Sequence, residues 1–143
     1  MEQLKSDYLF VYSSLMKGFK SRDYDYISQY FCFVSNGKVK GILSDLGDIP
    51  VATPSSEGHF IKGELYQIKN AEDFSFAIGQ LDDYEGVRPE ADEMQLYKRE
   101  LATVYKEDES AVNAWIYWYQ GDVAGKPVIT SGDVMEYIRS RGI

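Results

Sequence analysis

Hydrophobic and polar residues alternate along several short stretches of the chain, which is the pattern of β-strands with one buried face. Aromatic and β-branched residues, which favour strands, are frequent in these stretches. The expected strands cover residues 8–12, 30–35, 38–44, 59–68, 95–106 and 111–119. Short turn sequences join several of them, which predicts a largely antiparallel sheet.

Two turns are indicated by local sequence. Asn36-Gly37 favours a type I′ turn, because both central residues of that turn adopt positive φ. It predicts a hairpin between strands 30–35 and 38–44. Glu107-Asp108-Glu109-Ser110 predicts a second hairpin between the two long strands that flank it.

A helical repeat is clearest over residues 71–81. Apolar residues recur there at i, i+3, i+4 and i+7, namely Phe74, Ala77, Ile78 and Leu81. Asn70 precedes the segment and is a natural N-cap. Shorter helices are expected over residues 22–29 and 133–139. Many strands and few helices indicate the α+β class, with a sheet able to close into a barrel.

Composition and charge exclude several kinds of partner. A length of 143 residues fits one domain, so we expect residues 1–143 to form a single domain. The net charge is −8, and no run of Lys or Arg offers the basic patch of a nucleic-acid or membrane-surface protein. No apolar stretch approaches the roughly 18 residues of a membrane span, and the start of the chain lacks a signal-peptide pattern. We therefore expect a cytoplasmic protein with no nucleic-acid or membrane partner.

One cysteine and one histidine limit metal and nucleophile chemistry. A disulfide within the chain, or a zinc site built from Cys and His, needs more of these residues. A Ser–His–Asp triad would have to use His59. We expect Cys32 to pack in the core and His59 to lie at the surface.

Aromatic residues are frequent, with 12 Tyr, 7 Phe and 2 Trp in the chain. Tyr97 and Arg99 share one face of their strand, and Trp115, Tyr117 and Tyr119 share one face of the next. These rings either line a cavity or pack against one another across the strands.

Two further segments carry candidate chemistry, each with a structural alternative. Asp82-Asp83-Tyr84-Glu85-Gly86 gathers acids at the end of the predicted helix. Mutual repulsion and burial there raise a carboxyl pKa toward values suited to general acid–base catalysis; the alternative is an acidic turn that faces solvent. Residues 12–18 place small side chains after a strand, where backbone N–H groups can meet an anion; the alternative is an ordinary turn.

Taken together and in order along almost the whole chain, these segments resemble motifs of the gamma-glutamylcyclotransferase-like family. The matching segments are Phe10-Val11-Tyr12-Ser13-Ser14-Leu15, Gly63-Glu64-Leu65-Tyr66, Leu81-Asp82-Asp83-Tyr84-Glu85-Gly86, Tyr97-Lys98-Arg99, Ala114-Trp115-Ile116-Tyr117 and Ile129-Thr130-Ser131-Gly132-Asp133. The resemblance implies a small mixed, largely antiparallel β-barrel with flanking helices. It also implies release of 5-oxoproline from a small gamma-glutamyl substrate, with no metal and no cofactor.

The resemblance also assigns roles to individual residues. Glu85 matches the family's catalytic glutamate and would act as general acid and base. The residues that would contact the substrate come from the loop and from two strands: Tyr12, Ser13, Ser14, Leu15, Tyr97 and Tyr117. By contrast, we expect Phe10, Phe74 and Trp118 to lie in the core.

Two other functions stay open at this point. Ser13 stands where the family has glycine after tyrosine, which motivates a non-catalytic small-molecule binding module on the same fold. Exposed aromatic rings would instead suit a protein-interaction role. The leaving amine and the oligomeric state are left open.

Overall fold

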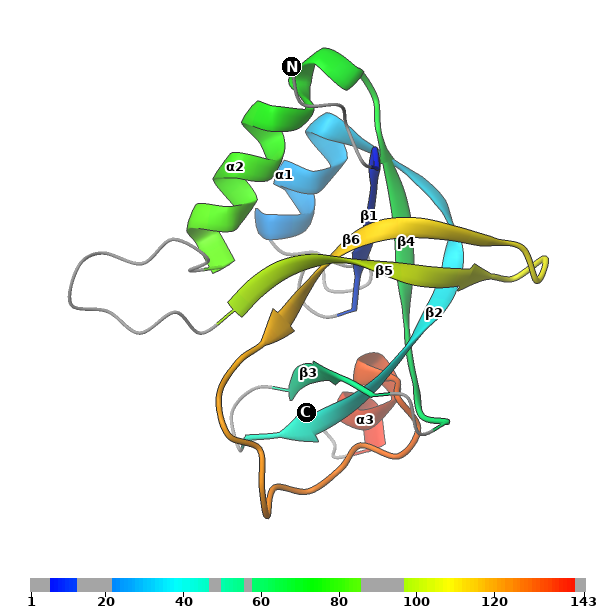
Figure 1. Ribbon diagram of the computed structural model, residues 1–143, viewed down its shortest axis with the longest axis vertical. Coiled ribbons are helices and arrows are strands. Elements are labelled where there is room, and N and C mark those ends of the chain that lie inside the picture. Colours follow the sequence, from blue (N-terminus) through cyan, green and yellow to red (C-terminus); the bar gives the residue numbers. More distant parts are fainter. Residues whose placement is uncertain (1–5, 13–21, 47–49, 56–57, 86–96, 141–143) are drawn as a thin grey trace.

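The computed structural model describes residues 6–12, 22–46, 50–55, 58–85 and 97–140, and in this part of the chain five strands close into a barrel (Figure 1). These strands are β1 (Tyr8–Val11), β2 (Phe31–Asp45), β4 (Phe60–Ile68), β5 (Tyr97–Lys106) and β6 (Ala111–Tyr119). They neighbour one another in the order β2, β4, β1, β6, β5, and β5 returns to pair with β2. β1 runs parallel to β6, whereas the other pairs run antiparallel. The predicted α+β barrel, mixed and largely antiparallel, is confirmed.

The hairpin predicted at Asn36-Gly37 is wrong. β2 is continuous, and these two residues lie in its middle, paired with Glu64 and Gly63 of β4. Gly37 has no positive φ. A Cβ at Gly37 would come within 2.8 Å of Val104 Cγ1, at the point where β5 meets β2. The glycine therefore permits the close approach of another strand, a requirement that turn propensity does not reveal.

An additional strand, β3 (Pro50–Pro54), extends the sheet beside the end of β2. The sequence did not predict it, because its terminal prolines favour turns. Proline cannot donate a ladder hydrogen bond and is tolerated at a sheet edge, which is where β3 lies. The hairpin predicted at residues 107–110 does join β5 and β6.

Three helices flank the barrel in the described residues: α1 (Arg22–Tyr30), α2 (Phe74–Glu85) and α3 (Val134–Ser140). A short 3-10 turn, η2 (Ala71–Asp73), leads into α2, and the predicted N-cap is present: Asn70 Oδ1 accepts from the Glu72 N–H at 3.0 Å. α2 runs one turn beyond the predicted end at Leu81, through Glu85. The prediction stopped there because Asp82 and Asp83 are polar, yet Asp82 is buried.

The core has two parts, divided by the barrel wall. Leu9 and Val11 of β1 pack beneath α1 and α2, whereas Phe10 of β1 and Tyr12, which follows the strand, point into the barrel. Figure 1 shows α1 and α2 together on one side and α3 at the opposite end. The three residues expected in the core are all buried: Phe10, Phe74 and Trp118.

Cys32 is exposed, so its predicted place in the core is wrong. Phe31, its neighbour in β2, faces the core with 2% of its surface exposed. Alternation along the strand therefore turns Cys32 to the outside. His59 is exposed, as expected.

No helix in the described ranges is both long enough and apolar enough to cross a membrane.

Candidate active site

The last turn of α2 is tied to the barrel by one buried carboxylate. Asp82 has 1% of its side chain exposed and accepts from Arg99 through both oxygens. Arg99 Nε lies 2.7 Å from Oδ1, and Arg99 Nη2 lies 3.0 Å from Oδ2. Such a two-point contact fixes the orientation of both groups as well as their separation.

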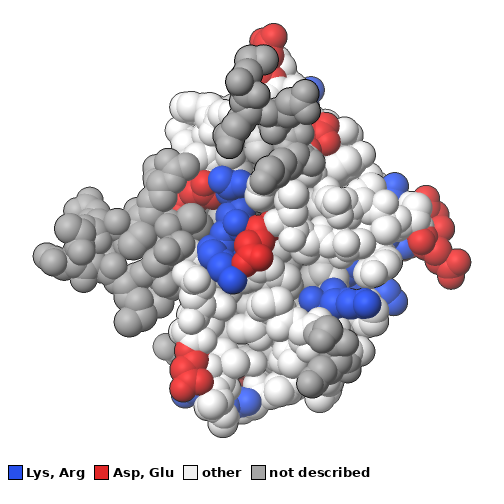
Figure 2. Space-filling view, in the orientation of Figure 1, with Lys and Arg blue, Asp and Glu red and all other residues white. Residues whose placement is uncertain are grey.

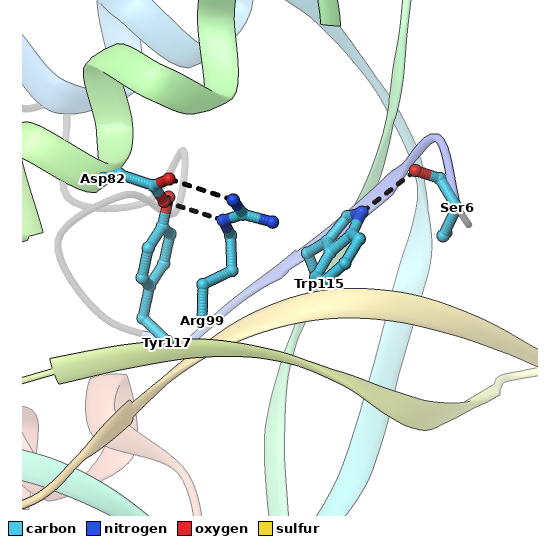
Figure 3. Close-up of polar contacts among 5 residues, drawn as sticks. All are labelled: Ser6, Asp82, Arg99, Trp115 and Tyr117. Carbon is cyan, nitrogen blue, oxygen red and sulfur yellow. Dashed lines mark hydrogen bonds and ion pairs between the residues drawn. The ribbon is translucent and has the colours of Figure 1, made fainter. Parts of the chain in front are cut away.

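The neighbouring strand completes this cluster. Arg99 of β5 and Tyr117 of β6 are register partners, so their side chains leave the same face of the sheet. Tyr117 donates its hydroxyl to Asp82 Oδ1 at 2.8 Å. Figure 3 shows both side chains rising from the two strands toward Asp82 at the end of the helix.

Trp115 supports the arginine from the side. The Arg99 guanidinium lies 4.6 Å from the centre of the Trp115 ring, a cation–π contact. The indole Nε1 donates to the Ser6 carbonyl at 3.0 Å, which holds the ring against the chain that leads into β1 (Figure 3). The cluster therefore joins α2, β5, β6 and the segment before β1.

Charge compensation holds this cluster together. Burial by itself lowers the pKa of Arg99, but the hydrogen bond and the negative charge of Asp82 outweigh it and leave the pKa raised. The guanidinium thus stays charged beside the carboxylate. A buried carboxylate with such a partner is stable, and it becomes costly when the partner is removed.

This arrangement was not predicted from the sequence. Asp82 does not face solvent: it is buried, and it accepts from Arg99 and Tyr117, two partners that neither interpretation of the acidic segment named. The available signal was a Leu-Asp pair at the end of an amphipathic helix together with a lone arginine on a strand face. Nothing in their spacing showed that the two would meet.

The predicted substrate-contacting tyrosines lie close to this cluster. Tyr12 is buried and donates its hydroxyl to the Tyr117 carbonyl at 2.8 Å. Tyr117 is also buried, and its hydroxyl is directed to Asp82. Tyr97 packs edge-on against Tyr119 at 5.5 Å between ring centres. The Tyr12 hydroxyl therefore reaches the main chain at Tyr117, but the two side chains pack on opposite faces of the barrel wall; Tyr97 lies on the same face as the Tyr117 ring.

Other predicted site residues lie outside what the structure describes. Ser13, Ser14 and Leu15 fall in the segment 13–21, which follows directly after Tyr12. Glu85 is the last residue of α2, and only its backbone is described. It comes three positions after Asp82 in the sequence.

Comparison with known proteins identifies the family. The sequence pattern of "gamma-glutamyl cyclotransferase, AIG2-like" proteins matches residues 9–136, from β1 into α3. The chain belongs to this family. Membership supports a cyclotransferase-type enzyme in general terms.

Solved structures share the AIG2-like fold with this chain. YkqA from Bacillus subtilis is 24% identical over 96% of this chain, with a TM-score of 0.68, and this chain spans only 43% of YkqA. An AIG2-like protein from Mus musculus is 22% identical, with 85% of this chain and 84% of that chain covered and a TM-score of 0.64. A protein named gamma-glutamyl cyclotransferase is 14% identical, with 87% and 70% covered and a TM-score of 0.55. No curated protein sequence matches the chain.

Proposed function

We propose that this protein is a cofactor-independent gamma-glutamyl cyclotransferase that releases 5-oxoproline and an amine, with Glu85 as general acid and base. The family match carries the proposal, because it spans the strand that leads into the loop 12–15, the end of α2, and strands β5 and β6. We include in it a small-molecule gamma-glutamyl substrate.

The reaction needs a proton carrier and a folded substrate. The substrate's α-amine attacks its own γ-carbonyl carbon; a new C–N bond forms, and the bond to the leaving amine breaks. The attacking ammonium loses two protons as it becomes the lactam N–H, and the leaving nitrogen gains two and departs as an ammonium, so one carboxylate can both accept and return protons. The attack is intramolecular, and holding the glutamyl chain in its folded form supplies much of the rate.

The contacts of Asp82 favour Glu85 for this role. Asp82 already accepts from Arg99 and Tyr117 and is buried, so a substrate proton has no access to it. Its contacts instead anchor the last turn of α2 to the barrel. Glu85 ends that same turn, and a fixed backbone keeps a general acid–base group in position for reaction.

We assign the stabilisation of the developing negative charge to the segment that follows β1. Backbone N–H groups of residues 12–15 would stabilise the oxyanion that develops at the γ-carbonyl. Tyr12 is held against β6 through the Tyr117 carbonyl, which fixes the point where this loop begins. Tyr97 and Tyr117 would line the pocket.

The test is direct detection of 5-oxoproline. Purified protein is incubated with a panel of gamma-glutamyl amino acids, peptides and amines, and 5-oxoproline is measured by mass spectrometry. Glu85→Gln should abolish release while the melting temperature is kept. The matched control is Glu136→Gln, at an exposed position in α3, which should retain full turnover.

Two results would contradict the proposal. Full turnover by Glu85→Gln would show that another group carries the proton. Binding of gamma-glutamyl compounds without any 5-oxoproline would favour the non-catalytic module that Ser13 motivates.

A further inference from the structure

Residues 6 and 7, which directly precede β1, are bound to the strands on both sides of it. The Ser6 hydroxyl donates to the Asn113 carbonyl of β6 at 2.6 Å. Asp7 is bound to β4, since its carbonyl accepts from the Ile68 N–H at 2.9 Å and its carboxylate accepts from the Gln67 amide at 2.9 Å. These contacts give a segment that is neither helix nor strand a fixed place on the barrel.

Trp115 of β6 takes its orientation from this segment. Its indole Nε1 donates to the Ser6 carbonyl at 3.0 Å, and its ring is partly buried against the core beneath α1 and α2. An indole N–H needs a hydrogen-bond partner when the ring packs in the protein, so the acceptor helps to fix how the ring lies. The orientation of the Trp115 ring therefore depends on the position of the Ser6 carbonyl.

The same ring contacts the ion pair at the end of α2. Leu101 of β5 is the register partner of Trp115, and Arg99 lies two positions before it on the same strand face. The Arg99 guanidinium lies 4.6 Å from the centre of the Trp115 ring. Its Nε and Nη2 bind Asp82 (Figure 3). The ring thus packs on the guanidinium whose edge holds the carboxylate.

The ring also limits competition for the guanidinium. Figure 2 shows basic and acidic side chains side by side over the first part of β5. Lys98 and Glu100, on either side of Arg99, form an exposed ion pair there. Exposed ion pairs contribute little to stability, because water and other charges compete for each partner. The Arg99 side chain is only 20% exposed, and an aromatic ring against it favours the single arrangement with Asp82.

From these contacts we infer that Trp115 is a positioning residue for the last turn of α2. Its ring holds Arg99 against Asp82, and its N–H makes that contact depend on where residues 6 and 7 lie. The inference rests on the proposed function, because the last turn of α2 carries Glu85, the proton carrier of that reaction. In this role Trp115 acts on kcat without touching the substrate, and the segment before β1 contributes to catalysis through it.

Two replacements of Trp115 separate its ring from its N–H. Trp115→Phe keeps an aromatic face for Arg99 but loses the donor to Ser6, and Trp115→Leu loses both. On the best substrate of the panel, kcat should fall about threefold in the first and about tenfold in the second, because a cation–π contact contributes up to about one such factor. The KM should stay unchanged in both variants, since neither change removes a group that binds the substrate.

Trp118→Phe is the matched control. Trp118 is buried inside the barrel, on the opposite face of β6 from Trp115. Its replacement should lower the melting temperature, because a buried ring is made smaller, and it should leave kcat unchanged. Equal losses of kcat in Trp118→Phe and Trp115→Leu would show that Trp115 only stabilises the fold, and the inference would be wrong.

Ser6→Ala tests the segment before β1. It removes the hydroxyl that binds Asn113, which loosens the Ser6 carbonyl, and kcat should fall about two- to threefold. In a Trp115→Phe background the same change should have no further effect, because Ser6 then has no indole N–H to hold. Independent losses that multiply would contradict the role given to residues 6 and 7. Ser28→Ala, which removes a hydroxyl bound to the Asp25 carbonyl in α1, is the control and should keep kcat.

Hydrogen exchange separates the inference from the proposed function, because it needs no turnover. In Trp115→Leu the backbone amides of residues 82–85 should exchange about tenfold faster than in wild type, whereas Trp118→Phe should leave them no faster than the rest of α2. If wild type releases no 5-oxoproline but this local effect is present, the cyclotransferase is wrong and the positioning of α2 by Trp115 stands. Unchanged exchange of these amides in Trp115→Leu would overturn the inference.

Discussion

Asp82 at the end of α2 and Arg99 on β5 are joined through both oxygens of one carboxylate, although they lie 17 positions apart in the sequence. A second strand contributes, because Tyr117 of β6 donates to the same carboxylate. The helix end is thus attached to the barrel wall by charge and hydrogen bonds rather than by apolar packing alone. Both stability and the placement of Glu85 should depend on this attachment.

Removing the arginine tests the contribution to stability. Arg99→Met keeps much of the side-chain volume but leaves Asp82 buried without its counter-charge. The free energy of unfolding should fall by about 3 kcal/mol, because an uncompensated buried charge is costly. Urea denaturation followed by fluorescence measures the change.

Lys98→Met is the matched control for this variant. Lys98 pairs with Glu100 at 2.5 Å, but both side chains are more than two-fifths exposed, at 43% and 46%. Exposed pairs contribute about 0–1 kcal/mol, so this variant should be nearly neutral. Equal effects of Arg99→Met and Lys98→Met would show that burial does not strengthen the Asp82 contact.

Two glycines should respond in opposite ways to alanine. A Cβ on Gly63 would overlap the Val11 carbonyl oxygen and lie 2.6 Å from Phe10 Cζ, so β1 and β4 would have to separate. We expect Gly63→Ala to lower the free energy of unfolding by about 2 kcal/mol. At Gly79, within α2, a Cβ meets nothing within 4 Å. Gly79→Ala should therefore raise stability by about 0.5–1 kcal/mol, since alanine favours helix.

Thermal and urea denaturation of both glycine variants provide the measurement. The pair is informative because the substitution is the same and only the surroundings differ. A neutral Gly63→Ala would mean that β1 and β4 do not approach as closely as described.

Local patterns predicted much of the fold, because strand alternation, helical periodicity and the Asn70 cap each depend on a few neighbouring residues. Predictions failed where a distant strand decided the outcome. Gly37 is glycine because β5 crosses β2 there, and Asp82 is buried because Arg99 meets it from another strand. The spacing of residues along the sequence does not show which distant residues come into contact. At the candidate site, the resemblance supplied Glu85 and the tyrosines but not the ion pair that anchors their surroundings.

Cys32 offers a test of how β2 is oriented, because its side chain was predicted to be in the core and is exposed instead. Its side chain is exposed, so a thiol reagent should reach it in the folded protein. We expect one thiol to react with DTNB under native conditions as completely as in urea, and Cys32→Ser to remove the signal. Reaction only after unfolding would place Cys32 in the core after all.

The link between the Asp82 cluster and Glu85 should appear in kinetics. Asp82→Asn keeps the shape of the side chain but removes the charge that Arg99 and Tyr117 bind. The last turn of α2 would then shift relative to the sheet, and misplacing a catalytic group by about 1 Å lowers the rate by up to roughly a hundredfold, so we expect a lower kcat. The KM should change little, because Asp82 is buried away from the substrate in the proposed mechanism. Steady-state assays of 5-oxoproline release measure both constants.

A milder variant keeps this prediction testable if Asp82→Asn unfolds. Tyr117→Phe removes only the hydroxyl that donates to Asp82, and it should lower kcat in the same direction with a smaller loss of stability. Asp73→Asn, at an exposed position before α2, is the control and should leave kcat unchanged. If both Asp82→Asn and Tyr117→Phe stay folded with full kcat, the ion pair stabilises the barrel without positioning Glu85.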